Sequence, residues 1–381
     1  MKSNSHMEDQ LRVLLEANQP ENRAAWAAVA KEQGQKVLGL LCIYVPEEIV
    51  SAAGVLPWRI TGSWEESTPQ ASFYRPEMTC RYCSHVLESV LTGELDFLDG
   101  VATTQVDDDF KRLWDVLDYV GKPPFAHIMY LPHTVSRTTL GMWNQSVRDL
   151  VTAMEKFAGV KIGEEDLLAQ IAIYNQMRRL LYRVYQLRKK PTPPLTGAEM
   201  LALTTAARIM PKPEFNQRLA SLLPYLETRQ PARKNHTPRL LLCGEYLDNP
   251  AYVQVVEDSG ALVVMDELDT GSKYFMGLVD TSQGDTLGQL AERYMNRPGL
   301  SRMGDWQGQA AQIISWVKEY QVQGVVELRQ LYSLPLDYRA FFLGHALKEA
   351  GIPYLTLNRE YHPSHLGMLS TRVEAFVEMI Q

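Results

Sequence analysis

The chain has 381 residues, of which 45% are hydrophobic and 22% charged, a composition typical of a globular protein with an extensive core. Its formal charge of -7 disfavours nucleic acid as a partner, because a polyphosphate backbone repels net negative charge. No apolar run approaches the roughly 18 residues of a membrane span, and the polar start lacks the apolar segment of a secretory signal. We therefore expect a cytoplasmic protein whose partners are neither nucleic acid nor a membrane.

Short apolar runs alternate with amphipathic stretches in two parts of the chain, which predicts an α/β fold. Residues 1–35 have a loose helical spacing and are expected to form an N-terminal helical cap. Strand and helix patterns then alternate over 36–140, helical patterns alone fill 141–236, and the alternation resumes over 237–381. The sequence thus predicts two doubly wound, mostly parallel α/β domains joined by a helical connector.

Eight apolar runs are the candidate strands. They lie at 36–45, 56–61, 99–106, 125–131, 238–245, 261–267, 324–332 and 352–358. Open parallel sheets bind ligands beyond the carboxyl ends of their strands. The segments that matter most are therefore expected at 42–48, 104–109 and 332–337.

Four cysteines are too few to staple a chain of this length, which favours a reducing compartment with thiolate or metal chemistry. Cys80 and Cys83 form a CxxC motif in a helical context, and two thiols at this spacing share one helical face. Without a second ligand pair, one or two packed and inert thiols explain the motif more simply than a metal site does. Cys42 is a third candidate ligand, whereas Cys243 ends a buried strand and is interpreted as a packed thiol.

Acidic residues follow two of the strand ends. Asp107, Asp108 and Asp109 follow a strand and are interpreted first as a solvated helix start, since an acidic first turn is common. The functional alternative is metal or cluster ligation by a carboxylate at the active edge of the sheet. Glu48 has the same two interpretations, a first-turn charge or a catalytic general acid or base.

Four segments together resemble the 2-hydroxyacyl-CoA dehydratase family, which includes the core subunits of ATP-dependent benzoyl-CoA reductase. They are LLCIYVPEEIVSAAGVLPWRITG at 40–62, CRYCSHVLESVLTGELDFLDGVATT at 80–104, GVVELRQLYSLPLDYRAFFLGHALKEAGIPYLTLNREY at 324–361 and GMLSTRVEAFVEMI at 367–380. The resemblance implies two Rossmann-like domains and a homologous partner subunit. It also implies an acyl-CoA thioester substrate and an ATP-dependent activator protein that donates electrons.

The resemblance further implies an oxygen-sensitive iron-sulfur cluster, of the [4Fe-4S] kind or absent from this subunit. The family supplies three cysteines, and their positions in this chain are held by Cys80, Asp107 and Ser333. Only the first is a thiol, and oxygen donors suit such iron less well than thiolate. We predict that Cys80, Asp107 and Ser333 are the metal ligands if a cluster is present, with Cys42 as a replacement thiol.

Three functions are compatible with these features. The first is a subunit that takes part in low-potential, one-electron ketyl radical chemistry on an acyl-CoA, either dehydrating it or reducing an aromatic ring. The second is a cluster-free partner subunit that shapes the substrate site. The third is a small-molecule binding protein on the same fold.

Overall fold

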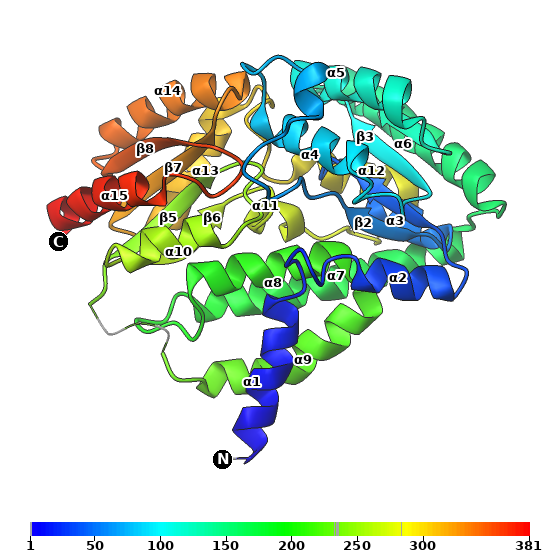
Figure 1. The fold of residues 1–381 in the computed structure, drawn as a ribbon. Helices are drawn as coiled ribbons and strands as arrows, with labels where there is room; N and C mark the ends of the chain where they lie inside the picture. Colours follow the sequence, from blue (N-terminus) through cyan, green and yellow to red (C-terminus); the bar gives the residue numbers. More distant parts are fainter. Residues whose placement is uncertain (1, 232, 234–235, 283) are drawn as a thin grey trace.

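The structure is a computed structural model that describes residues 2–231, 233, 236–282 and 284–381. It contains two four-stranded sheets in which every neighbouring pair of strands is parallel. The sheets lie side by side above a layer of helices, with the N-terminal helix beneath that layer (Figure 1). The expected fold class, two doubly wound α/β domains with helices between them in the chain, is confirmed.

The first sheet has the strand order β2-β1-β3-β4. Its strands are β1 (Val37–Leu40), β2 (Leu56–Arg59), β3 (Gly100–Thr104) and β4 (Ala126–Met129). The residues of β1, β2 and β3 are all buried, as the continuous apolar runs predict for strands covered on both faces. From β1 the chain continues to β2 on one side of the sheet, and from β3 it continues to β4 on the other side. The carboxyl ends of β1 and β3 therefore form a topological switch point.

Helices of this domain begin and end at recognisable signals. They are α3 (Glu47–Ala52), η1 (Ala71–Phe73), α4 (Arg81–Leu91), α5 (Asp108–Val116) and η2 (Leu117–Gly121). Pro46 occupies the cap position of α3, and Gly54 follows that helix with a φ of +74°, a left-handed conformation that favours glycine. Asp107 caps α5 by accepting a hydrogen bond from the backbone of Phe110 at 2.9 Å.

The second sheet repeats this topology with the order β6-β5-β7-β8. Its strands are β5 (Arg239–Gly244), β6 (Leu262–Glu267), β7 (Gly324–Gln330) and β8 (Tyr354–Arg359). Its helices are α10 (Ala251–Asp258), α11 (Ser272–Phe275), α12 (Thr286–Asn296), α13 (Trp306–Glu319), α14 (Leu334–Glu349) and α15 (Leu366–Ile380). A second switch point therefore lies at the carboxyl ends of β5 and β7. All eight candidate strands are present.

Helices without strands occupy the chain before the first sheet and between the two sheets. They are α1 (Lys2–Leu15), α2 (Ala25–Glu32), α6 (Arg137–Ala158), α7 (Glu164–Leu187), α8 (Gly197–Ile209) and α9 (Lys212–Thr228). Helix α1 packs on α8 and α9, whereas α2 packs on β1 and β2. Residues 1, 232, 234, 235 and 283 fall within the four expected regions but outside the described part of the chain.

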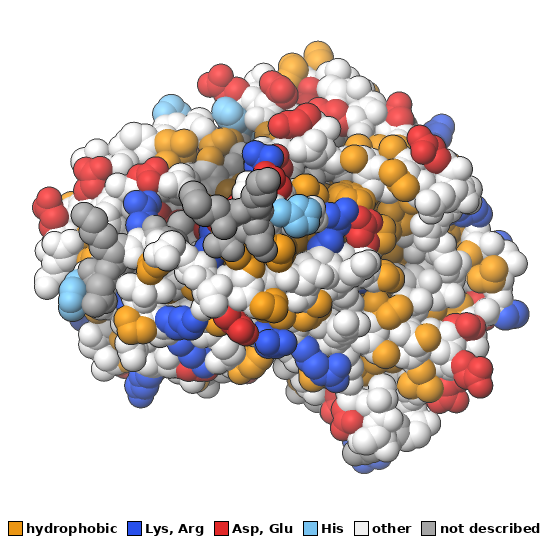
Figure 2. Space-filling model, turned by 90° about the horizontal axis from the view of Figure 1, so that it is seen from below, with side chains coloured by type: hydrophobic (Ala, Val, Ile, Leu, Met, Phe, Trp, Pro, Cys, Tyr) orange, Lys and Arg blue, Asp and Glu red, His pale blue; other side chains and the backbone are white. Residues whose placement is uncertain are grey.

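Within the described residues, no helix combines the length and the apolar character needed to cross a membrane. On the face seen from below, Lys and Arg side chains stand among acidic and apolar ones (Figure 2).

Candidate functional site

The two switch points face each other across an interdomain seam. We use this term for the contact between the strand ends of the two sheets. Tyr246, after β5, stacks on Tyr82 of α4 with ring centroids 4.8 Å apart. Arg81 lies over the ring of Tyr332, which follows β7, at 5.3 Å. Of the three segments expected to matter, 332–337 therefore touches the first domain at the start of α4, through Tyr332.

Cys80 and Cys83 lie on the first-domain side of the seam. Cys80 is the cap residue of α4 and is 2% exposed, and its N–H donates a hydrogen bond to Asp109 Oδ1 at 3.2 Å. Burial and the hydrogen bond with Cys80 raise the pKa of Cys83 well above its usual value. Cys83 is thus a protonated thiol at neutral pH, and a metal would have to displace its proton.

Asp107 is buried, so the expectation that the acidic triplet stays solvated is wrong for this residue. The residue is 6% exposed because α4 and the opposite domain cover the start of α5. Its Oδ2 lies 3.6 Å from Arg302 Nη2. Burial raises the pKa of Asp107 to about 6. A carboxyl with this pKa exchanges its proton near neutrality, which suits proton transfer.

Cys42 lies at the carboxyl end of β1, next to the second domain. Its sulfur accepts a hydrogen bond from the Tyr44 N–H at 3.5 Å, and burial raises the pKa of the thiol. The Tyr44 hydroxyl accepts a hydrogen bond from the backbone of Leu300 at 3.4 Å, while its ring faces the Arg297 guanidinium at 4.7 Å. Cys42 therefore lies close to the segment that follows α12.

Ser333 caps α14 without a side-chain cap hydrogen bond and is 2% exposed. The preceding residue, Tyr332, has a left-handed backbone with a φ of 63°. This turn presents the Tyr332 ring to Arg81, whose Nε lies 3.1 Å from Glu360 Oε2. Ser333 therefore directly follows Tyr332, which is a residue of the seam.

Glu48 is fully buried behind the seam, in a contact between α3, α7 and α12. It forms an ion pair with Arg178 and accepts a hydrogen bond from the Tyr294 hydroxyl at 2.7 Å. The Tyr294 ring in turn faces Arg297 at 5.2 Å. The described contacts give Glu48 a structural role, and its catalytic role stays a prediction.

A second buried network of charges lies under the strand ends of the second sheet. Lys273 Nζ lies 2.5 Å from Glu267 and 3.4 Å from Glu245, and Arg339 contacts Glu267 at 2.6 Å and also pairs with Glu327. Glu245 also accepts a hydrogen bond from the Ser301 hydroxyl at 2.8 Å. These contacts fix the position of Glu245 and therefore that of Tyr246, the next residue, which lies in the seam.

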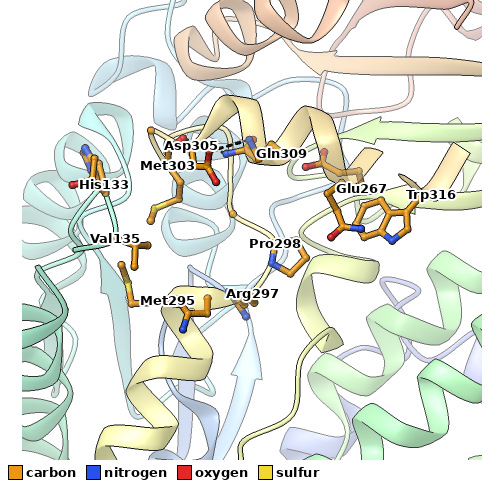
Figure 3. A pocket seen from close by; sticks show the side chains of 16 residues that line it. His133, Val135, Glu267, Met295, Arg297, Pro298, Met303, Asp305, Gln309 and Trp316 are labelled. Carbon is orange, nitrogen blue, oxygen red and sulfur yellow. Dashed lines mark hydrogen bonds between the residues drawn. The ribbon is translucent and has the colours of Figure 1, made fainter. Parts of the chain in front are cut away.

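Two cavities open along the seam. One, of about 600 Å³, is lined by the loop that follows β4, by residues 295–299 and by the start of α13 (Figure 3). His133 and Val135 lie on one side of it and Glu267 and Trp316 on the other, with Arg297 among the lining residues. The second, of about 430 Å³, is lined by polar residues that include Arg75, Arg81, His85 and Glu360. Both exceed the lower limit of roughly 300 Å³ for small-molecule sites.

The side chains of the seam offer a limited set of metal donors. In the described part of the chain, no group of three or more His, Cys, Asp or Glu is arranged to hold a metal ion. A cluster on Cys80 and Asp107 would need Ser333, or a donor from another chain, as a further ligand. Among the described residues, a single metal ion would therefore find at most two such ligands.

Sequence patterns did not identify several residues of the seam. Arg297, Arg302 and Tyr246 all lie in loops between the expected elements, where periodicity carries no information. The only local signal for Arg297 is the Pro298-Gly299 pair that follows it, which marks the turn after α12.

Comparison with known proteins identifies the family. The model of the 2-hydroxyglutaryl-CoA dehydratase D-component family matches residues 42–380. The chain is 24% identical to the (R)-phenyllactyl-CoA dehydratase beta subunit of Clostridium sporogenes, with 92% of this chain and 93% of the relative covered. It is 22% identical to one of the subunits of benzoyl-CoA reductase from Thauera aromatica, covering 92% of each chain. It is also 22% identical to the (R)-2-hydroxyglutaryl-CoA dehydratase beta subunit of Acidaminococcus fermentans, with 92% and 94% covered. The chain therefore belongs to the 2-hydroxyglutaryl-CoA dehydratase D-component family.

Proposed function

We propose that the chain is the subunit of an acyl-CoA dehydratase or benzoyl-CoA reductase-like enzyme that binds the acyl-CoA thioester in the seam between its two domains. The observation that carries this proposal is the cavity of about 600 Å³ at the carboxyl edges of two parallel sheets, where such sheets bind ligands. The similar proteins are named as subunits of enzymes that act on CoA thioesters, which supports the same substrate class here.

The residues of the seam give this site its chemistry. Asp107 does not line either cavity, but it faces Arg302, which precedes the cavity residue Met303, and with a pKa of about 6 it can hold or release a proton near neutral pH. The buried Tyr82 and Tyr246 stack closes the space between the domains, which keeps water from the strand ends. Arg302 faces Asp107 and stabilises its ionised form, so it assists proton release.

A binding experiment tests this function. Butyryl-CoA is titrated by calorimetry into the wild type, into Met303→Trp and into Met368→Trp. Met303 lines the cavity and is 5% exposed, whereas Met368 is 62% exposed and serves as the matched control. We expect binding to the wild type and to the control but not to Met303→Trp. Absence of butyryl-CoA binding to the wild type in complex with its partner would reject the proposal, and binding of another metabolite would favour the small-molecule binding protein.

A finer part of the proposal concerns the electron-transfer chemistry. Ketyl radical chemistry requires a low-potential iron-sulfur cluster, for which Cys80 is the retained thiol and Asp107, Ser333 and Cys42 are the further candidate ligands. The iron content after anaerobic reconstitution with the partner subunit tests it. Iron that is lost in Cys80→Ala but retained in Cys243→Ala supports ligation by Cys80. No iron in the wild-type complex leaves the cluster-free alternative.

The partner is proposed to be a homologous subunit, with an ATP-dependent activator as electron donor. An aromatic strip on α14 supports a protein partner, because large apolar side chains stay exposed there: Leu334 (64%), Tyr338 (63%), Phe341 (63%) and Phe342 (44%). Such patches are typical of protein interfaces. The strip begins directly after Ser333, so a protein bound to it would lie beside the seam.

Co-purification tests this surface. Phe341→Ser is expected to lower the yield of the complex with the co-expressed homologous subunit at least about tenfold, as an aromatic residue at the centre of an interface does. Tyr119→Ser, at a residue of the first domain that is 74% exposed, is the control and should have no effect. Equal recovery of both variants would contradict the docking surface.

A further inference from the structure

A further cavity, of about 300 Å³, lies between the N-terminal helices and the first domain. Its walls combine residues of the segment between α1 and α2 with residues that follow β2 or precede β3. Helix α2 packs on β2 at this edge of the first sheet (Figure 1). We call it the cap cavity, because residues of the N-terminal helical cap form part of its wall. None of its lining residues also lines either cavity of the seam.

The cap cavity has aromatic walls. Trp58, Trp64 and Phe97 line it together with Leu95 and Pro20. Trp58 is 1% exposed and meets Phe97 edge to face, with ring centroids 5.1 Å apart. Aromatic side chains arranged in this way gain further energy from contact with another ring. This part of the cavity therefore suits a large apolar group.

Three charged side chains line the same cavity, and they carry both signs. Arg23 donates a hydrogen bond to the carbonyl oxygen of Gly62 at 3.3 Å and lies over the Trp64 ring at 5.4 Å, but it pairs with no carboxylate of the described residues. Glu65 and Glu94 are exposed, and Glu94 accepts a hydrogen bond from a serine hydroxyl at 3.0 Å. Neither glutamate forms an ion pair within the described part of the chain. The cavity thus offers one unpaired cation and two unpaired carboxylates.

These charges restrict the chemistry of the ligand. Their sum is one negative charge, which disfavours a phosphate or a dicarboxylate. A simple amine would match the glutamates but leave Arg23 without a partner, and a simple carboxylate would do the reverse. A zwitterion supplies a carboxylate for the guanidinium and an ammonium for the glutamates. The indole N–H of Trp64 is buried and has no acceptor among the described residues, so a second donor lies beside Arg23 for the same carboxylate.

We propose that the cap cavity binds a free α-amino acid with a large apolar side chain. Arg23 binds the carboxylate, Glu65 and Glu94 bind the ammonium, and the aromatic walls contact the side chain. The volume lies at the lower limit of roughly 300 Å³ for small-molecule sites, which suits one amino acid and not a CoA thioester. The amino acid is thus a second ligand, and the inference does not depend on the proposed function.

Calorimetric titration of the full chain with L-phenylalanine tests the inference. Three related compounds each lack one recognised group: 3-phenylpropionate has no ammonium, phenethylamine has no carboxylate and L-alanine has no large side chain. We expect each of them to bind about tenfold or more weakly than L-phenylalanine, as the loss of one charge-assisted pair or of the buried ring predicts. No binding of L-phenylalanine to the wild type, or an equal affinity for any of the three compounds, would overturn the inference.

A substitution of the arginine tests the carboxylate end of the site. Arg23→Gln should weaken the binding of L-phenylalanine about tenfold or more and leave that of phenethylamine unchanged. Arg12→Gln makes the same charge change at a side chain of α1 that is 66% exposed, and it should bind L-phenylalanine as the wild type does. Undiminished binding of L-phenylalanine to Arg23→Gln would contradict the assignment.

A double variant tests the ammonium end and decides the matter if Arg23→Gln fails to fold. Glu65→Gln/Glu94→Gln changes two exposed residues and should keep the melting temperature of the wild type. It should bind L-phenylalanine about tenfold or more weakly, and 3-phenylpropionate no more weakly than the wild type does. The control Glu16→Gln/Glu21→Gln makes the same charge change at exposed residues of the cap and should bind as the wild type does. An unchanged affinity of Glu65→Gln/Glu94→Gln for L-phenylalanine would reject the amino acid site.

Discussion

Tyr246 of the second domain stacks on Tyr82 of the first, with ring centroids 4.8 Å apart and planes inclined by 10°. Both rings are buried, and Phe110 and Tyr361 extend the contact on either side. The seam is thus held by an aromatic cluster as well as by charges. Its geometry determines how close the strand ends of the two sheets lie.

Tyr246→Ala is expected to lower the free energy of unfolding by about 3 kcal/mol, the usual cost of truncating a buried aromatic side chain. Denaturant unfolding measures this loss. Tyr338→Ala, at a residue that is 63% exposed, is the control and should change stability by less than about 0.5 kcal/mol. A small loss in Tyr246→Ala would mean that the stack does not hold the domains together.

Asp107→Asn is expected to change how stability depends on pH. The pKa of Asp107 is raised to about 6 by burial, so the folded state binds its proton more tightly than the unfolded state does. The group therefore stabilises the fold fully below about pH 4, and this contribution of about 3 kcal/mol is lost as the pH rises through 6. Unfolding free energies measured between pH 4 and 7 should fall less steeply with pH in the variant, which keeps the helix cap. Parallel profiles of the two proteins would contradict the raised pKa.

His85→Asn is expected to have the opposite effect in the same pH range. Burial lowers the pKa of His85 to about 4, and its Nδ1 lies 2.8 Å from the Ser63 carbonyl oxygen. The neutral ring stabilises the folded state above about pH 6.5, and this contribution is lost as the pH falls toward 4. The variant should lose less stability than the wild type on acidification. The effects of Asp107 and His85 on the pH dependence of stability have opposite signs. The free energy of unfolding of the double variant Asp107→Asn/His85→Asn, measured between pH 4 and 7, should therefore depend on pH almost as that of the wild type does.

Arg339→Met is expected to destabilise the protein by about 3 to 5 kcal/mol, because it leaves Glu267 and Glu327 buried with fewer counter-charges. Arg329→Met is the matched control, since Arg329 pairs with Asp337 at the surface at 2.9 Å. That variant should cost less than about 1 kcal/mol. Denaturant unfolding of both variants at pH 7 measures the difference. Equal losses would indicate that the buried carboxylates do not depend on Arg339.

The sequence by itself determined the elements of the fold. Apolar runs located all eight strands, and local signals such as Pro46 and Gly54 located the start and end of α3. These features depend on residues close together in the chain, which is why periodicity and caps reveal them. Four segments with their spacing were enough to indicate the family, which the family model and the similar proteins then established.

Only the tertiary structure decided the environment of each candidate residue. Glu48 meets Arg178, which lies 130 positions further along the chain, and Asp107 meets Arg302 of the other domain. Arg297 is notable for the partners it does not have among the described residues. Burial and pairing are sums over groups brought together by folding, so no local pattern predicts which carboxylate keeps its proton or which arginine remains unpaired.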